Sequence, residues 1–290
     1  MKMKILLLFF AMLIPLSGDT VPEAFRQYWY KGKAELTRYS LEQARYGEIH
    51  RGDAVLIFVT EPFLSEKQVK KESTSNAPAV SVLKLNLTKK FFTGIYPYSL
   101  MTSVFTPVDY GKNRTLKVAS SIQEWCGQTY SQLNLRNDRY KGIMHSYFEE
   151  EADQTLEFNT GWLEDEIWTR IRIAPETLPV GEINIVPALQ FVQLGHSDLK
   201  PEKAMASRKN EGKIFIYVVD YKTINRSLTI RFESSFPHAI LSWEEKGAGG
   251  FGPNAPVLTT RGVKTHSLML DYWNKHRNQD APLREKLGLK

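Results

Sequence analysis

Alternation of apolar and polar residues with a period of two is the feature that most constrains how this chain can fold. Residues 227–233 read Ser-Leu-Thr-Ile-Arg-Phe-Glu, so Leu228, Ile230 and Phe232 project to one side. In a strand, residues two apart share a face, whereas a helix scatters them around its axis. The segment therefore predicts an antiparallel strand with one side buried and the other solvated.

Other parts of the chain have the same alternation or are rich in β-branched and aromatic residues. These are residues 54–60, 80–87, 90–95, 116–125, 213–221 and 239–244. Short strands separated by turns favour a sandwich, an open barrel or a curved meander. We therefore expect a mainly β protein, with antiparallel curved sheets or an open barrel formed by two β-rich halves.

Residues 162–173 (WLEDEIWTRIRI) interrupt this pattern. Leu163, Ile167 and Ile171 are four residues apart, acidic residues fill the first turn, and Arg170 and Arg172 close the last, as the dipole of a helix favours. The segment predicts one mid-chain amphipathic helix, although the alternation over 167–173 also fits a strand. It marks the boundary between an N-terminal β-rich half (19–160) and a half with the helix and a β-meander (161–290).

The last residues predict a short C-terminal helix. Asp280 is a suitable capping residue, Leu283 and Leu287 fall on one face, and Gly288 is suited to end the helix. Residues 271–277 also have a helical composition and follow a strand-like run over 263–270.

The N-terminus resembles a secretory signal peptide over residues 1–18. Lys2 and Lys4 precede an apolar run over 5–16, small residues follow, and Asp19 begins the polar chain. This run is too short to span a membrane as a helix, which needs about 20 apolar residues; the alternative is a buried N-terminal helix. No cysteine follows the small residues, so we expect a soluble, exported protein, periplasmic or extracellular, without a lipid anchor.

Charge and cysteine content exclude several classes of protein. The 38 basic and 32 acidic residues give a net charge of +6, too small and too dispersed to predict nucleic-acid binding. No later apolar run approaches the length of a transmembrane helix. The single cysteine excludes an intramolecular disulfide, and there is no HExxH, CxxC or EF-hand pattern, so we expect no metal and no cofactor.

Cys126, in the string Glu-Trp-Cys-Gly-Gln over 124–128, is the residue that most invites a catalytic interpretation. A thiol becomes a nucleophile when a histidine lowers its pKa, which would give a thiol-dependent hydrolase. The alternative is a small buried apolar side chain at the end of a strand. The glycines of 247–252 match GxGxxG, but Pro253 and Pro256 follow where a helix must begin, which predicts a loop.

Residues 38–48 predict a strand that is unusually polar for a core. Gln43 and Arg45 share one of its faces, so they would orient a ligand if that face lines a cavity, and would be solvated at an edge. Together with the string around Cys126 they give the candidate ligand-binding residues, with no catalytic residue among them: Gln43, Arg45, Glu124, Cys126 and Gln128.

Several strings together resemble an uncharacterised family of exported or lipid-anchored bacterial proteins, some of them labelled septum formation inhibitor Maf. They lie at 29–35, 42–48, 58–61, 93–98, 124–128 and 163–172. The label implies a nucleotide pyrophosphatase, but this chain lacks the Ser-x-Ser-Pro-Arg-Arg loop of Maf proteins. Residues 178–182 and the meander over 183–243 are similar to envelope β-proteins of the DUF3108 kind, a resemblance that implies a curved sheet or open barrel.

These features lead to one expected function and two alternatives. We expect a non-enzymatic, exported binding, carrier or scaffold protein of the cell envelope. Its partner would be a lipid, an amphipathic small molecule or an envelope protein. The alternatives are the thiol-dependent hydrolase centred on Cys126 and the Maf-type pyrophosphatase.

Overall fold

The computed structural model describes residues 21–72, 74–109, 114–159, 161–252 and 254–289, so the predicted signal peptide lies outside the described residues. The helices are α1 (Glu23–Trp29), α2 (Glu164–Ile173), α3 (Leu189–Gly195) and α4 (Pro282–Lys286), with 3₁₀ turns at Pro175–Thr177, Tyr272–Asn274 and Asn278–Asp280. The strands of the first half are β1 (Ala34–Arg45), β2 (Glu48–Leu64), β3 (Val69–Lys70), β4 (Val80–Thr93), β5 (Tyr96–Pro107), β6 (Lys117–Glu124), β7 (Gly127–Arg136), β8 (Arg139–Ser146) and β9 (Gln154–Asn159). Those of the second half are β10 (Trp162–Leu163), β11 (Gly181–Val186), β12 (Glu202–Glu211), β13 (Ile214–Tyr221), β14 (Arg226–Glu233), β15 (Ile240–Ala248) and β16 (Val257–Leu270).

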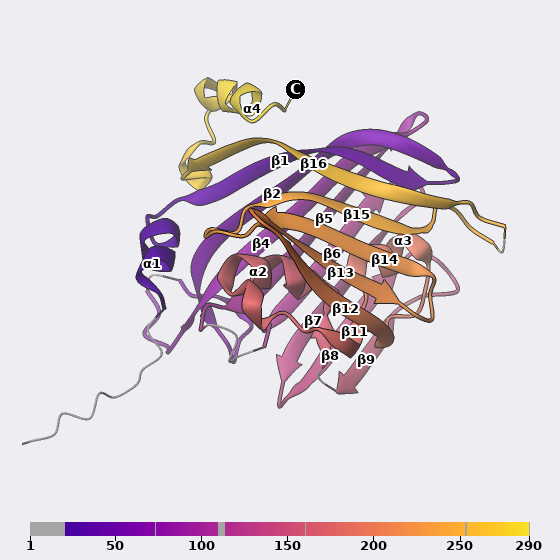
Figure 1. The fold of residues 1–290 in the computed structure, drawn as a ribbon, viewed down its shortest axis with the longest axis horizontal. Helices are drawn as coiled ribbons and strands as arrows, with labels where there is room; N and C mark the ends of the chain where they lie inside the picture. The colour runs from indigo at the N-terminus through magenta and orange to yellow at the C-terminus, as the bar shows by residue number, and fades with distance from the viewer. Residues whose placement is uncertain (1–20, 73, 110–113, 160, 253, 290) are drawn as a thin grey trace, which may run out of the picture.

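All the described strands belong to one sheet, which confirms the mainly β, antiparallel prediction (Figure 1). The order is β10-β11-β12-β13-β14-β15-β16-β1-β2-β4-β5-β6-β7-β8-β9, with β3 paired to β2. Every pair is antiparallel except β10 with β11. The first strand of the chain pairs with the last, Ala34 opposite Leu270, so hydrogen bonds join the two β-rich halves in one sheet.

The two edges of this sheet are consecutive in the chain. Strand β9 ends at Asn159 and strand β10 begins at Trp162, yet they stand at opposite ends of the strand order. Three peptide units span at most about 11 Å between Cα atoms, so the sheet must curl until its edges approach each other. The result is a barrel-like sheet that is not closed, as Figure 1 shows.

Helix α2 packs within this curve, against β4 and β5 (Figure 1). The predicted mid-chain helix is thus confirmed, preceded by the two residues of β10. It differs from an amphipathic surface helix because all ten of its residues are buried, the five charged ones included. Buried charges require partners, and strands from both halves of the chain supply them.

The Arg172 guanidinium shows how such a charge is accommodated. Its Nη1 and Nη2 atoms donate to the two carboxylate oxygens of Glu35 on β1, at 2.7 and 2.6 Å. The Tyr28 hydroxyl donates to the same carboxylate, at 2.5 Å. Burial by itself raises the pKa of Glu35, but the Arg172 charge and these hydrogen bonds more than offset it and hold that pKa at about 2. This ion pair fixes the helix to the strand at the centre of the sheet.

The element boundaries depart from the sequence-based expectations in several places. The strand expected over 38–48 ends at Arg45, and a turn separates it from β2. The runs over 80–87 and 90–95 form a single strand, β4, which continues to Thr93 before the turn at Gly94. The short helix α3 was not predicted, because seven residues after Pro187 carry no clear helical period. At the C-terminus, α4 confirms the predicted short helix, but Ala281 rather than Asp280 precedes it.

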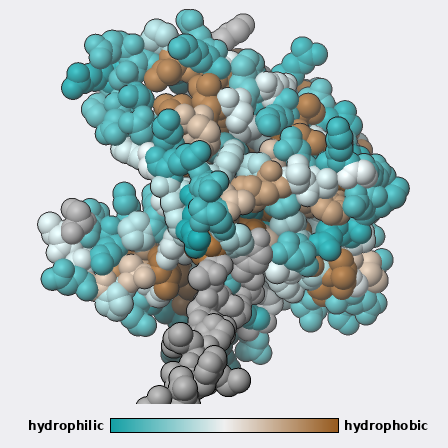
Figure 2. All heavy atoms as spheres, turned by 60° about the vertical axis from the view of Figure 1, so that its left-hand side comes forward, coloured by the Kyte–Doolittle hydropathy of each residue, from teal (hydrophilic) through white to brown (hydrophobic). Residues whose placement is uncertain are grey.

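On the side that bears α1, polar residues cover most of the surface and apolar residues form small separate groups (Figure 2). Among the described residues, none of the helices combines the length and the apolar character needed to cross a membrane. The division into halves at residue 160 remains a prediction.

Candidate functional site

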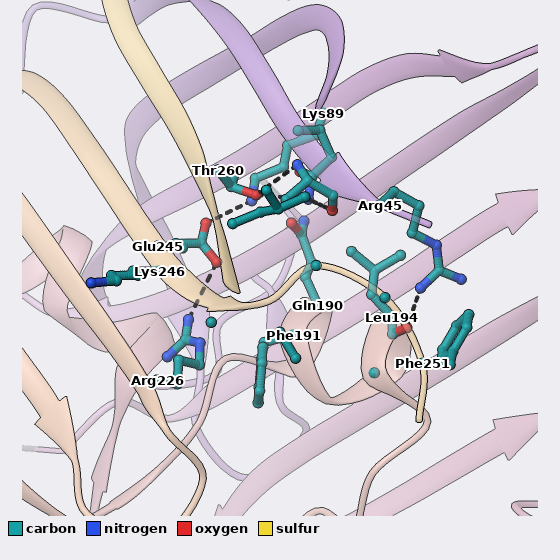
Figure 3. A pocket seen from close by; sticks show the side chains of 18 residues that line it. Arg45, Lys89, Gln190, Phe191, Leu194, Arg226, Glu245, Lys246, Phe251 and Thr260 are labelled. Carbon is teal, nitrogen blue, oxygen red and sulfur yellow. Dashed lines mark hydrogen bonds and ion pairs between the residues drawn. The ribbon is translucent and has the colours of Figure 1, made fainter. Parts of the chain in front are cut away.

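A cavity of about 90 Å³, lined by both charged and apolar residues, lies between helix α3 and the ends of strands β1, β4, β14, β15 and β16 (Figure 3). We call it the interior pocket and define it by six polar residues of its lining: Gln43, Arg45, Lys89, Gln190, Arg226 and Glu245. Residues from both halves of the chain meet here, because β16 pairs with β1.

The alternation of β1 places Gln43 and Arg45 in the pocket. Both point inward with Tyr39 and Leu41, while Ser40 and Glu42 face solvent. Gln43 is 5% exposed and Arg45 is 9% exposed. Of the two interpretations of residues 38–48, the structure therefore supports the one in which Gln43 and Arg45 line a cavity.

Each of these two side chains has one polar atom without a partner. The Gln43 Nε2 atom donates to the Thr260 hydroxyl and to the Ala44 carbonyl, both at 3.1 Å, while its Oε1 atom has no partner. The Arg45 Nη1 atom donates to the Leu194 carbonyl, and Nη2 lies 3.4 Å from the Tyr98 hydroxyl, while Nε has no partner.

Helix α3 brings Gln190 to the opposite side of the pocket, and its Nε2 atom is likewise buried without a partner. Asp165 of α2 holds the start of α3, because its Oδ2 atom accepts the Leu189 N–H at 2.9 Å. At the other end, the Ser120 hydroxyl of β6 donates to Gln193 at 2.8 Å. Full burial raises the pKa of Asp165 to about 7, although the Leu189 hydrogen bond opposes this.

A chain of buried charges forms the floor of the pocket. Lys89 donates to Glu245 at 2.9 Å, and Arg226 donates to the other oxygen of Glu245 at 3.2 Å. Arg226 also makes a bidentate pair with Glu164 of α2, to which the Tyr221 hydroxyl donates as well. Burial by itself raises the pKa of Glu245, but Lys89 and Arg226 hold it at about 2. The floor is thus a continuous network of ion pairs from β4 to α2.

The candidate residues around Cys126 are only partly brought to this site. Glu124 lines a small recess next to the pocket that Arg45 also lines. Cys126 lies exposed in the turn between β6 and β7, and Gln128 is an exposed residue of β7, so the interpretation of Cys126 as a small buried side chain is wrong. The strand before the turn ends at Glu124, which leaves the thiol beyond the core.

The surroundings of Cys126 work against a thiolate. The Glu124 carboxylate, through a hydrogen bond and its negative charge, raises the pKa of the thiol. It also accepts the backbone N–H of Cys126 at 2.7 Å. A nucleophilic cysteine requires a lowered pKa, so this arrangement favours an inert thiol.

Sequence reasoning missed four residues of the pocket: Lys89, Gln190, Arg226 and Glu245. Two of them carry a signal that could have found them. Lys89 falls in the inward series of Leu85, Leu87 and Phe91, and Arg226 begins the inward series of Leu228. A charge in register with the apolar face of a strand indicates a buried ion pair or a site.

The comparisons give one structural likeness. No family model matches the sequence, and no curated protein matches it. A β-barrel-like protein of the domain of unknown function DUF1849 from Brucella abortus is similar in structure, with a TM-score of 0.47 and 7% sequence identity. The match covers 82% of this chain and 98% of that one.

Proposed function

We propose that this protein binds a small polar ligand in the interior pocket and does not transform it. The observation that supports this most is the meeting of three unpartnered, buried polar atoms around one cavity: Gln43 Oε1, Arg45 Nε and Gln190 Nε2. An unpaired buried polar group costs about 1–3 kcal/mol. A ligand that pairs with all three recovers that free energy, which gives the pocket affinity for it.

The dimensions of the pocket set the size of the ligand. Its volume of about 90 Å³ is well below the roughly 300–1,000 Å³ typical of sites for drug-sized molecules. The ligand is therefore a molecule of a few heavy atoms, or the polar end of a larger one. The charged side chains in its lining and this small volume favour such a ligand over an acyl chain.

The signal-like leader supports a location outside the cytoplasm, where such a protein would capture or carry its ligand. The thiol-hydrolase alternative draws less support, because Cys126 is exposed and the pKa of its thiol is raised. The pocket gives no support to the pyrophosphatase alternative, because its volume is far too small for a nucleotide.

A thermal-shift screen of small polar metabolites against the purified chain tests this proposal. We expect at least one compound to raise the melting temperature, and its affinity to fall at least tenfold in Gln190→Leu, which removes a donor and keeps the volume. The matched control is Gln128→Ala, at an exposed glutamine near the start of β7, which should bind as the wild type does. Equal binding by Gln190→Leu, or no stabilising compound at all, would overturn the proposal.

A further inference from the structure

We propose that the ligand of the interior pocket is a small organic anion, and that Arg45 is its counter-charge. The inference rests on the proposed function, since it names the chemical class of the ligand at the same site. It is carried by the charges around the pocket and by the atoms that lack partners.

Arg45 is buried without an acidic partner. Its guanidinium contacts a carbonyl oxygen and a hydroxyl, and no carboxylate of the described residues lies within ion-pair distance of it. The other deeply buried arginines differ: Arg172 pairs with Glu35, and Arg226 pairs with Glu164. Buried charges in proteins are normally paired, so the structure leaves one positive charge at the pocket to be balanced.

The remaining charges of the pocket floor cancel. Lys89 and Arg226 are two cations, and Glu245 and Glu164 are their two carboxylates. Asp165 lies beside them with its pKa raised to about 7, so it is largely neutral below that pH. Lys246, which also lines the pocket, is exposed and solvated. Glu124 lines the adjoining recess but, among the described residues, makes no ion pair with Arg45, so Arg45 is the unpaired buried charge of the pocket lining.

Aromatic rings leave an edge of this guanidinium for a ligand. Its Cζ atom lies 4.5 Å from the centre of the Tyr46 ring and 4.9 Å from that of Phe251. Phe251 belongs to the glycine-rich loop between β15 and β16 and lies beside the Arg45 guanidinium in Figure 3. Rings at these distances exclude water from the faces of the cation and lower the local dielectric. A negative charge at the free Nε edge is therefore attracted more strongly than it would be in bulk water.

The unpartnered atoms also define the groups of the ligand. Arg45 Nε and Gln190 Nε2 are donors, so they suit the oxygens of a carboxylate or a phosphate. Gln43 Oε1 is an acceptor, so it suits a hydroxyl or amino group of the same molecule. A small hydroxy acid or a phosphorylated small alcohol carries both kinds of group.

Paired probes test the charge of the ligand on the full chain without any substitution. We will compare lactate with lactamide, and glycerol 3-phosphate with glycerol, by calorimetric titration and thermal shift. We expect at least one of the two anions to bind at least tenfold more tightly than its neutral analogue. Its affinity should fall as the salt concentration rises. The two pairs distinguish a carboxylate ligand from a phosphate ligand.

Arg45→Gln then tests the residue, and its fold is checked by circular dichroism. We expect the preference for the anion to disappear in Arg45→Gln and to persist in part in Arg45→Lys, which keeps the charge if the first variant fails to fold. The control is Arg51→Gln, at an exposed arginine of β2. If the neutral analogues bind as tightly as the anions, the ligand need not be an anion, and the proposed binding function still stands. If none of the four compounds binds, the anion proposal is overturned, and the wider screen of polar metabolites still decides the proposed function.

Discussion

The ion pair between Glu35 and Arg172 offers the sharpest test of how the central helix is held. We predict that Glu35→Gln lowers the free energy of unfolding by about 3–5 kcal/mol, the usual cost of leaving one partner of a buried pair uncompensated. The amide keeps the shape of the side chain and removes only its charge. The loss is large because the Arg172 side chain is 1% exposed and cannot recover water.

The pKa of Glu35 gives a separate measure of the same interaction. It falls from its ordinary value of 4.5 to about 2 in the folded protein. Since a tenfold change in dissociation is worth about 1.4 kcal/mol, this lowering corresponds to about 3 kcal/mol. A carboxyl group with a lowered folded pKa stabilises above its unfolded pKa, so this contribution is complete above about pH 5 and is lost as the pH falls toward 2.

Urea unfolding at pH 7 and at pH 3, followed by tryptophan fluorescence, measures both quantities. In a thermal melt at pH 7 the same loss should lower the melting temperature of Glu35→Gln by about 6–10 °C, taking ~2 °C for each kcal/mol in a chain of this size. The control is Glu157→Gln, which breaks the exposed pair with Arg139 and should cost at most about 1 kcal/mol. A Glu35→Gln variant within 1 kcal/mol of the wild type at pH 7, or with the same acid dependence, would refute this account of the pair.

Three further outcomes follow from described contacts. Because burial raises the folded pKa of Asp165 to about 7, the wild type should lose stability relative to Asp165→Asn as the pH rises from about 4 to 7; parallel urea curves over that range would contradict this. Thiol labelling of native Cys126 should be slow at pH 7 and faster in Glu124→Gln, because Glu124 raises the pKa of the thiol; an unchanged rate would count against it. Gly262→Ala should destabilise by at least about 1–3 kcal/mol in thermal melts, since its Cβ would lie 2.2 Å from the ring of Trp243, and a melt like that of the wild type would show that the ring can move.

The sheet was predictable because its signal is local. The alternation of Leu228, Ile230 and Phe232 appears in the structure as inward residues that are fully buried along β14. The same holds for the inward face of β1, where Gln43 and Arg45 were identified as candidates. Each of these predictions needed only neighbouring residues two apart.

The charged residues of α2 were not predictable in the same way. Glu164, Asp165 and Glu166 point in different directions, toward Arg226, toward the backbone of α3 and toward Arg170. Their burial depends on partners 4 to 62 positions away, so no local pattern indicates it.

Most of the interior pocket was missed for the same reason. Lys89 and Glu245 are separated by 156 positions and meet only because β16 joins β1 in the sheet. The string over 124–128 was chosen as a candidate because it contains reactive residue types. In the structure, however, Cys126 and Gln128 are exposed to solvent. The sequence predicted which face of a strand or helix a residue lies on, but it did not predict which elements pack against one another.

The pairing of the first strand with the last has a consequence for how the molecule assembles. Strand β1 can pair with β2 early, but its other edge stays unpaired until residue 270 has been synthesised, because Ala34 lies opposite Leu270. Contacts this remote in sequence slow folding and leave unpaired strand edges exposed in the meantime. Deleting β16 and the residues after it should therefore yield aggregates rather than a smaller working protein, because the outer edge of β1 would stay unpaired.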